Sequence, residues 1–109
     1  MIKEKDVLAQ IEGLTVTRLR ICIEEAWVRP ARDTAGHVFD DLDVARLRLI
    51  SELTEDMAVN DDAVPIILSL IDQIHRFKRQ LRALEQAISV QDDAVRTDVA
   101  ALLREMETR

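Results

Sequence analysis

Residues 62–88 constrain the fold more than any other stretch of the chain. Their apolar side chains recur at alternating steps of three and four, which is the heptad pattern of a helix that packs against other helices. The seam residues are Ile67, Leu70, Ile74, Phe77, Leu81, Leu84 and Ile88. Such a helix is about 40 Å long, and the chain has too few other residues to cover its distal half. We therefore expect a homodimer through this seam, or a C-terminal segment that folds back on it.

Acidic residues mark where the helices of this region begin. Asp61 and Asp62 precede Pro65, and proline is tolerated in the first turn of a helix, so the long helix is expected to begin at residue 61 or 62. The heptad phase is not continued beyond the seam, and a second acidic start lies at residues 92–93. A separate short helix is therefore expected after a break near Ser89. Its apolar stripe is Val95, Val99, Leu102 and Met106.

The first part of the chain has the pattern of two short helices with a turn between them. Residues 5–11 place apolar side chains on one helical face, Gly13 interrupts the pattern, and Thr15 is a suitable N-cap for a second helix. This is the arrangement of a helix-turn-helix. The expected buried stripe of the second helix is Val16, Leu19, Ile23 and Ala26. Arg18 and Arg20 lie off that stripe, where a recognition helix carries its groove-facing charges and where an ordinary helix carries a solvated face.

Residues 28–39 carry the only strand-like pattern. Two short runs, Val28–Ala31 and His37–Phe39, flank a turn cluster that reads Asp-Thr-Ala-Gly, which predicts a small two-stranded hairpin. In a winged helix-turn-helix this hairpin would be the wing, and Arg29 and Arg32 on its flank would reach phosphate groups. An ordinary solvent-facing hairpin explains the same residues.

A third helix is expected after the hairpin. Asp40 is a suitable N-cap, and Asp41 and Asp43 in the first turn complement the positive end of the helix dipole. The expected buried stripe is Leu42, Ala45, Leu49 and Leu53. The acidic triplet has two interpretations, as helix capping or as a docking patch for a basic partner.

Composition limits the functions open to the chain. With 109 residues it suits one small domain, organised as a unit of residues 1–58 and a helical part of residues 59–109. The net charge of −6 argues against a dominant phosphate-binding surface. His37 and His75 have no partner at metal-ligand spacing, and two glycines supply no phosphate-binding loop, so no enzyme, metal or cofactor is expected. The lone Cys22 excludes an internal disulfide, and without a signal sequence or membrane span the expected location is cytoplasmic.

Residues 14–50 are similar to the MerR-type winged helix-turn-helix. The shared features, in chain order, are a recognition helix, a proline after its end, a wing glycine and an Asp-capped helix. The wing departs from the pattern because it reads Gly36-His37-Val38-Phe39 without the aromatic–arginine pair, and Ile21 and Cys22 stand where tyrosines are expected. The resemblance and the helical pattern imply a mainly α fold: a MerR-like winged helix-turn-helix with a small two-stranded wing, a long heptad-bearing helix and a short C-terminal helix.

Residues 38–88 are similar to the CbpM-like chaperone-modulator family. The matching pieces are Val38-Phe39-Asp40, then Asp56 through Val59-Asn60 to Val64, then Leu70-Ile71-Asp72-Gln73-Ile74. The resemblance implies a protein that binds the J-domain of a DnaJ-like, curved-DNA-binding co-chaperone and inhibits it. The family is understood to occupy the J-domain surface that would otherwise engage the DnaK-type chaperone. An acidic chain suits that partner, because a J-domain presents a basic helix.

The sequence leaves three functions open. For a chaperone modulator the candidate docking residues are Asp40, Asp41, Asp43, Asp61 and Asp62, although capping also explains each cluster. For a MerR-like DNA-binding transcriptional regulator, the required basic patch would consist of Arg18, Arg20, Arg29 and Arg32. The third hypothesis is an oligomeric helical adaptor with neither partner.

Overall fold

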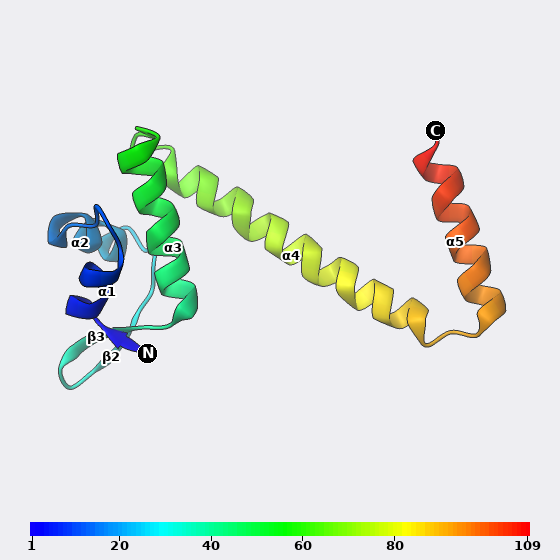
Figure 1. Cartoon of the computed structure of the whole chain (residues 1–109), viewed down its shortest axis with the longest axis horizontal. Coiled ribbons are helices and arrows are strands. Elements are labelled where there is room, and N and C mark those ends of the chain that lie inside the picture. The colour runs from blue at the N-terminus through cyan, green and yellow to red at the C-terminus, as the bar shows by residue number, and fades with distance from the viewer. The chain divides into compact units, whose positions relative to one another are not determined.

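The computed structural model describes all 109 residues of the chain. Its elements are β1 (Ile2–Lys3), α1 (Glu4–Gln10), α2 (Val16–Glu24), β2 (Ala31–Asp33), β3 (Gly36–Phe39), α3 (Asp41–Ser51), the π-helical turn η1 (Glu52–Asp56), α4 (Val64–Ser89) and α5 (Asp93–Glu107). Helices dominate and the sheet is small, so the predicted mainly α fold is confirmed (Figure 1). The chain divides into two compact units, Met1–Ser69 and Leu70–Arg109. This division falls inside α4, whereas the sequence-based division lies between residues 58 and 59.

The three strands form one antiparallel sheet in the order β1-β3-β2. The predicted hairpin is the β2–β3 pair, in which Asp33 lies opposite Gly36 at the turn. Gly36 supplies a φ of +128° there, a conformation that residues with a side chain rarely adopt. The first strand was not predicted: Ile2–Lys3 pairs with the other edge of β3, where Ile2 lies opposite Phe39. Two residues are too few to show an alternating pattern, so this strand is determined by the edge of β3 alone.

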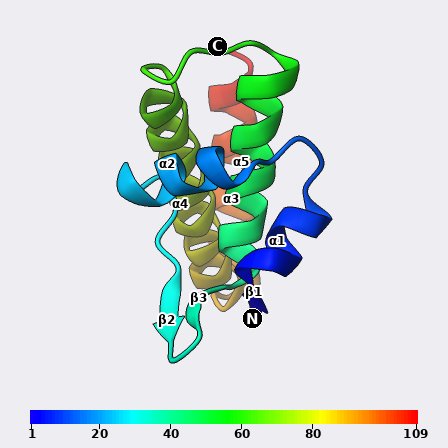
Figure 2. The ribbon, with the colours of Figure 1, turned by 90° about the vertical axis from the view of Figure 1, so that its left-hand side faces the viewer.

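The hydrophobic core lies within the first unit, where α1, α2 and the sheet surround one side and one end of α3 (Figure 2). Its buried residues are Val7, Ile11, Leu14, Leu19, Cys22, Trp27, Val28, Phe39, Leu47, Ile50, Val64 and Leu68. Val28 was expected in the hairpin, but β2 begins only at Ala31 and Val28 packs in the core instead. The core is therefore mostly aliphatic, as a chain with three aromatic residues requires.

The second helix of the helix-turn-helix is α2, and its N-cap is Thr15 as predicted. The Thr15 hydroxyl accepts a hydrogen bond from the amide at position N3 of the helix at 3.1 Å. The predicted buried stripe is only partly correct, because Leu19 is buried but Val16 is half exposed. Ala26 lies beyond the end of the helix, with a φ of 58°. Cys22 takes the second buried position, since it follows Leu19 by three residues and faces the same side.

The third predicted helix is α3, and it begins with a capping box. The Asp40 carboxylate accepts a hydrogen bond from the Asp43 amide at 2.8 Å, and the Asp43 carboxylate accepts one from the Asp40 amide at 3.0 Å. Asp43 is only 7% exposed. Leu47 and Ile50, four and seven residues further on, share its face and are buried. The predicted buried stripe was therefore wrong in the first turns of the helix. Leu42, which was expected to be buried, is 65% exposed.

The long helix α4 begins at Val64, later than the predicted residue 61 or 62. The chain turns before it, and the Ala63 amide donates to the Asn60 side-chain oxygen at 3.0 Å. Val64 and Leu68 anchor the helix in the core. The predicted seam lies off that anchoring face, and the seam residues from Leu70 to Leu84 are each 51–58% exposed.

The C-terminal helix α5 is separate from α4, as predicted. α4 ends at Ser89, and Asp92 caps α5 by accepting a hydrogen bond from the Val95 amide at 3.0 Å. No residue of α5 is buried. None of the helices combines the length and the apolar character that crossing a bilayer requires.

Candidate functional site

The recognition-helix position Arg18 is engaged within the protein. Its guanidinium Nη1 donates to the Asp61 carboxylate at 2.7 Å, and the side chain is only 20% exposed. Asp61 comes from the turn before α4, so this pair joins two segments that are far apart in the sequence. Burial raises the pKa of the neighbouring Cys22 thiol to about 11, while Arg18 opposes that rise. Cys22 is therefore an unreactive core thiol, because the thiolate is the reactive form.

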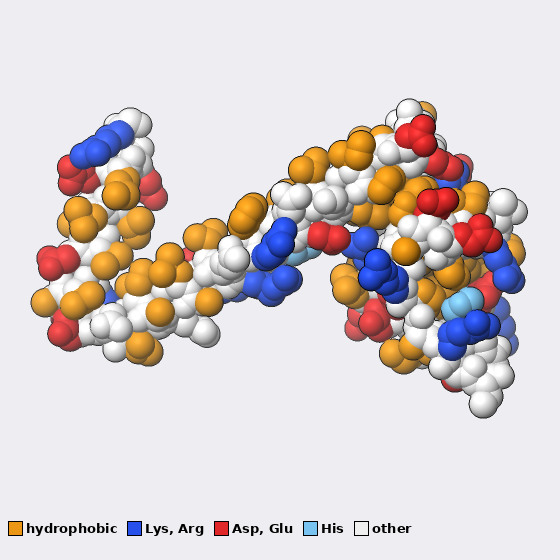
Figure 3. All heavy atoms as spheres, turned by 180° about the vertical axis from the view of Figure 1, so that it is seen from behind, with side chains coloured by type: hydrophobic (Ala, Val, Ile, Leu, Met, Phe, Trp, Pro, Cys, Tyr) orange, Lys and Arg blue, Asp and Glu red, His pale blue; other side chains and the backbone are white.

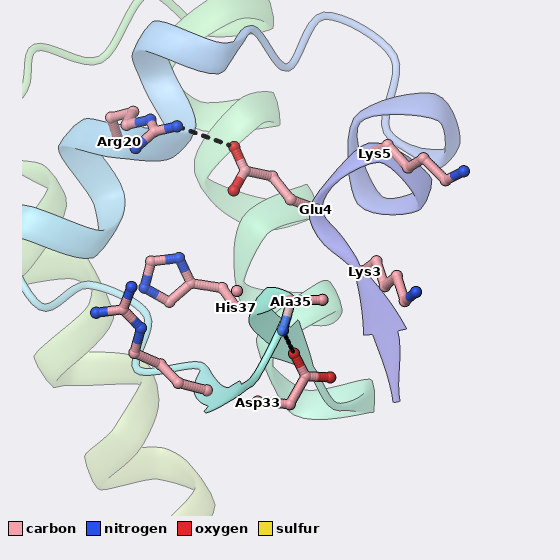
Figure 4. Close-up of a pocket in the computed structure, with 9 residues that line it drawn as sticks. Lys3, Glu4, Lys5, Arg20, Asp33, Ala35 and His37 are labelled. Atoms are coloured by element: carbon pink, nitrogen blue, oxygen red, sulfur yellow. Dashed lines mark hydrogen bonds and ion pairs between the residues drawn. The ribbon is translucent and has the colours of Figure 1, made fainter.

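A second arginine of α2 contributes to a basic hollow between the N-terminal segment, α2 and the β2–β3 hairpin. The cavity has a volume of about 380 Å³. It is lined by Lys3, Glu4, Lys5, Arg20, Arg32, Asp33, Ala35, Gly36 and His37 (Figure 4). Arg20 lies 3.5 Å from Glu4, and Asp33 accepts a hydrogen bond from the Ala35 amide at 2.8 Å. Four cationic side chains against two carboxylates make this hollow suited to an anionic group, such as phosphate.

The predicted basic patch is thus rearranged in the structure. Arg20 and Arg32 come together, Arg18 is held by Asp61, and Arg29 does not line the basic hollow. Sequence reasoning missed Lys3 and Lys5, which reach the hollow because β1 pairs with β3. The only sequence signal for them was a pair of lysines on either side of Glu4, and the strand that pairs with this segment lies more than thirty residues away.

An acidic hollow lies where the end of α2 meets the turn before α4. It has a volume of about 190 Å³ and is lined by Ile21, Glu25, Trp27, Asp61, Asp62 and Pro65. Trp27 is 5% exposed, and its carbonyl accepts a hydrogen bond from Arg46 Nε at 2.8 Å, which fixes this corner of the core. Apolar side chains with carboxylates around them would accept a basic side chain that carries an apolar stem. Of these residues, sequence reasoning had singled out Asp61 and Asp62 but not Glu25.

The other predicted docking cluster serves mainly to cap α3. Asp40 and Asp43 satisfy each other's backbone amides, and Asp43 is buried. Burial raises the pKa of the Asp43 carboxyl, and the hydrogen bond from the Asp40 amide opposes this effect. Asp41 is also exposed, and it takes no part in the capping box. No group of three or more His, Cys, Asp or Glu side chains is placed to hold a metal ion.

Together, these elements define the class of the protein. α1 and α2, separated by a turn at Gly13, form a helix-turn-helix, and the β2–β3 hairpin that follows is its wing. A family model described as MerR HTH family regulatory protein matches residues 5–86, which is well over half of the chain, so the chain belongs to this family. Searches of curated proteins and of solved structures gave no match.

Proposed function

We propose that this protein is a chaperone modulator that binds the J-domain of a DnaJ-like, curved-DNA-binding co-chaperone and inhibits it by protein–protein contact. Membership of the MerR family fits this function and also fits a DNA-binding regulator. The choice between them rests on the charged surfaces around α2 and on the resemblance of residues 38–88 to chaperone modulators.

The ion pair between Arg18 and Asp61 is the observation that carries the proposal. A DNA-reading helix keeps its cations free to contact phosphates and bases. Here a carboxylate neutralises Arg18, and Glu25 and Asp62 add further negative charge beside it in the acidic hollow. This part of the helix-turn-helix therefore repels a phosphate backbone and attracts a basic protein surface.

The acidic hollow has the features that a basic partner helix requires. Ile21 and Pro65 supply an apolar contact above the buried Trp27, and the carboxylates at its edge would pair with Lys or Arg side chains of the partner. Contacts of this kind, with apolar residues in the centre and polar groups at the rim, are the usual organisation of a protein interface. The net charge of −6 would also accelerate the encounter with a basic J-domain.

Calorimetric titration with the J-domain encoded by the same genome tests the proposal. We expect a heat of binding at tens of micromolar, and the double variant Glu25→Lys with Asp62→Lys should bind at least about tenfold more weakly, equivalent to about 1.4 kcal/mol. Association should also slow as salt rises, because exposed charges are screened beyond about 10 Å at 0.1 M. Asp61 is left unchanged, since it holds Arg18.

A matched control carries the same change of net charge elsewhere. Asp6→Lys with Glu12→Lys replaces exposed acidic residues that do not line the acidic hollow. This variant should bind almost as well as the parent chain. Equal weakening by both pairs would mean that only overall charge attracts the partner. No heat of binding, with both proteins folded, would leave the regulator and adaptor hypotheses.

A DNA-binding regulator is the second candidate, and the basic hollow favours it. Arg20 of the recognition helix and Arg32 of the wing both line it. Lys3 and Lys5 of the N-terminal segment also line it, and their side chains point away from Arg20 (Figure 4). The recognition helix and the wing both contact DNA in winged helix-turn-helix proteins. The hollow is small and partly neutralised, so contact with a few phosphates is the most that its charges support.

A mobility-shift assay at physiological salt distinguishes the two candidates. We expect at most a weak shift that is independent of sequence and disappears as salt rises, because phosphate contacts lose affinity steeply with salt. Arg20→Glu with Arg32→Glu should remove even that shift. Tight binding to one sequence at this salt, abolished by the same variant, would make the regulator the better-supported function.

A further inference from the structure

The helices α4 and α5 each carry an apolar face that the chain leaves uncovered (Figure 3). On α4 the uncovered face is the heptad seam. On α5 it is the predicted stripe, and none of that helix is buried. The family match ends at residue 86, so membership of the family assigns no role to α5.

The spacing of these two faces is complementary. Read backwards from Ile88, the seam of α4 steps by four, three and four residues, and the stripe of α5, read forwards from Val95, steps in the same way. Two antiparallel helices therefore bring the residues together in four layers. The layers are Ile88 with Val95, Leu84 with Val99, Leu81 with Leu102, and Phe77 with Met106.

The link between the helices favours the same register. Only residues 90–92 separate the end of α4 from the start of α5. Antiparallel helix hairpins are joined by loops of about 2–5 residues, so this link suits a hairpin that folds back around Gln91. The four apolar pairs are symmetric about a point between Gln91 and Asp92. Link length and apolar spacing thus agree without any sliding of one helix along the other.

Charged residues beside the layers agree with this pairing. Glu85 follows Leu84 in α4, and Arg96 follows Val95 in α5, so an antiparallel pair places the two opposite charges on the same side of the seam. The stretch Arg76–Arg82 of α4 carries four cations and no acid. In contrast, residues 92–107 carry five carboxylates and two arginines. The two helices are therefore complementary in charge as well as in apolar spacing.

The hairpin leaves part of the seam for a second copy of the chain. With Phe77 opposite Met106, near the end of α5, Leu70 and Ile74 lie beyond the reach of that helix. The seam of α4 can also pair with the seam of α4 in a second copy. When these two helices run antiparallel and cross at Arg79, their apolar residues lie opposite one another. The pairs between two copies are Leu70 with Ile88, Ile74 with Leu84, and Phe77 with Leu81.

We infer that α5 folds back along α4 as an antiparallel hairpin, and that the hairpins of two copies close into a four-helix bundle. A lone hairpin leaves one side of every apolar layer in water, whereas four antiparallel helices with short loops enclose their layers. The second copy covers the remaining seam, and α5 supplies half of the helices in the bundle. This inference stands apart from the choice of J-domain or DNA as partner.

Engineered disulfides in the full-length chain test the register. Leu84→Cys with Val99→Cys places two thiols in one layer of the hairpin, where mild oxidation should close a disulfide within one chain. Phe77→Cys with Val95→Cys is the matched control, because its residues come from the same faces but lie about 16 Å apart along the paired helices. Parent chain treated with the same oxidant controls for Cys22, which is buried.

Non-reducing electrophoresis separates the outcomes. The inference predicts a disulfide within one chain of 12.4 kDa for the matched pair and little for the control. Equal closure of both pairs would show that α5 has no fixed register and would overturn the inference. If the matched pair yielded only disulfide-linked dimers, the inference would also be overturned, because α5 would then pair with α4 of the second copy.

Sedimentation tests whether α5 belongs to the bundle. Val99→Asp with Leu102→Asp should shift the mass at micromolar concentration from twice 12.4 kDa toward 12.4 kDa. Thr97→Asp with Ala100→Asp has the same spacing on another face of α5 and should leave the dimer intact. Circular dichroism should show that both variants keep the helices of the parent chain. A dimer unaffected by either change would exclude α5 from the interface.

Discussion

Leu81→Asp combined with Leu84→Asp is expected to convert the proposed dimer of this protein into a monomer. Both leucines lie in the exposed seam of α4, and each is more than half exposed in the single chain. Full burial of a leucine side chain contributes about 1.5–3 kcal/mol. A dimer loses four such side chains, and about half of each remains to be buried on assembly, so the lower value gives a loss on the order of 3 kcal/mol. That loss corresponds to dissociation about 10²-fold more favourable.

Sedimentation at micromolar concentration measures this effect. The parent should sediment at twice the chain mass of 12.4 kDa, and the double variant at that mass. Ala83→Asp with Gln86→Asp introduces the same charges at the same spacing on another face of α4, and this control should remain dimeric. A parent chain that sediments as a monomer would refute the interface. Retained helical circular dichroism would show that the variant failed to assemble rather than to fold.

Leu47→Ala is expected to cause the largest loss of stability among single leucine substitutions in α3. Leu47 is fully buried, and removal of such a side chain costs about 2–5 kcal/mol, depending on how far the cavity collapses. Small domains unfold with a free energy of about 5–15 kcal/mol in total. The variant should therefore unfold at much lower urea concentration with a similar slope.

Leu42→Ala in the same helix is the matched control for this measurement. Leu42 is 65% exposed, so its truncation should change the free energy of unfolding by no more than about 0.5 kcal/mol. The sequence pattern predicts the reverse, with Leu42 in the buried stripe. Similar losses from the two substitutions, or a larger loss from Leu42→Ala, would contradict the orientation of α3 in the structure.

The starts of α2, α3 and α5 were predictable from the sequence because they depend on neighbouring residues. Thr15, Asp40 and Asp92 each accept a hydrogen bond from an amide three residues further along the chain. An interaction of this range is visible in a short stretch of sequence. The wing turn at Gly36 and the break after Ser89 were predictable for the same reason.

The orientation of each helix was less predictable. In α3 an alternative apolar stripe competed with the real one, and only the packing of Leu47 and Ile50 into the core decided between them. In α4 the strongest apolar pattern is the exposed seam, while Val64 and Leu68 anchor the helix. Periodicity shows that a helix has an apolar face, but it does not show which partner covers that face.

The sequence by itself determined the helices, the hairpin and the heptad seam of this protein, because capping, turn formation and periodicity act between residues close together in the chain. The tertiary structure decided which charges form a site. Arg18 meets Asp61 across 43 positions of sequence, and Lys3 and Arg32 line the same hollow because β1 and β2 both pair with β3. Such contacts follow from how the core packs, and a single sequence does not encode them in any local pattern.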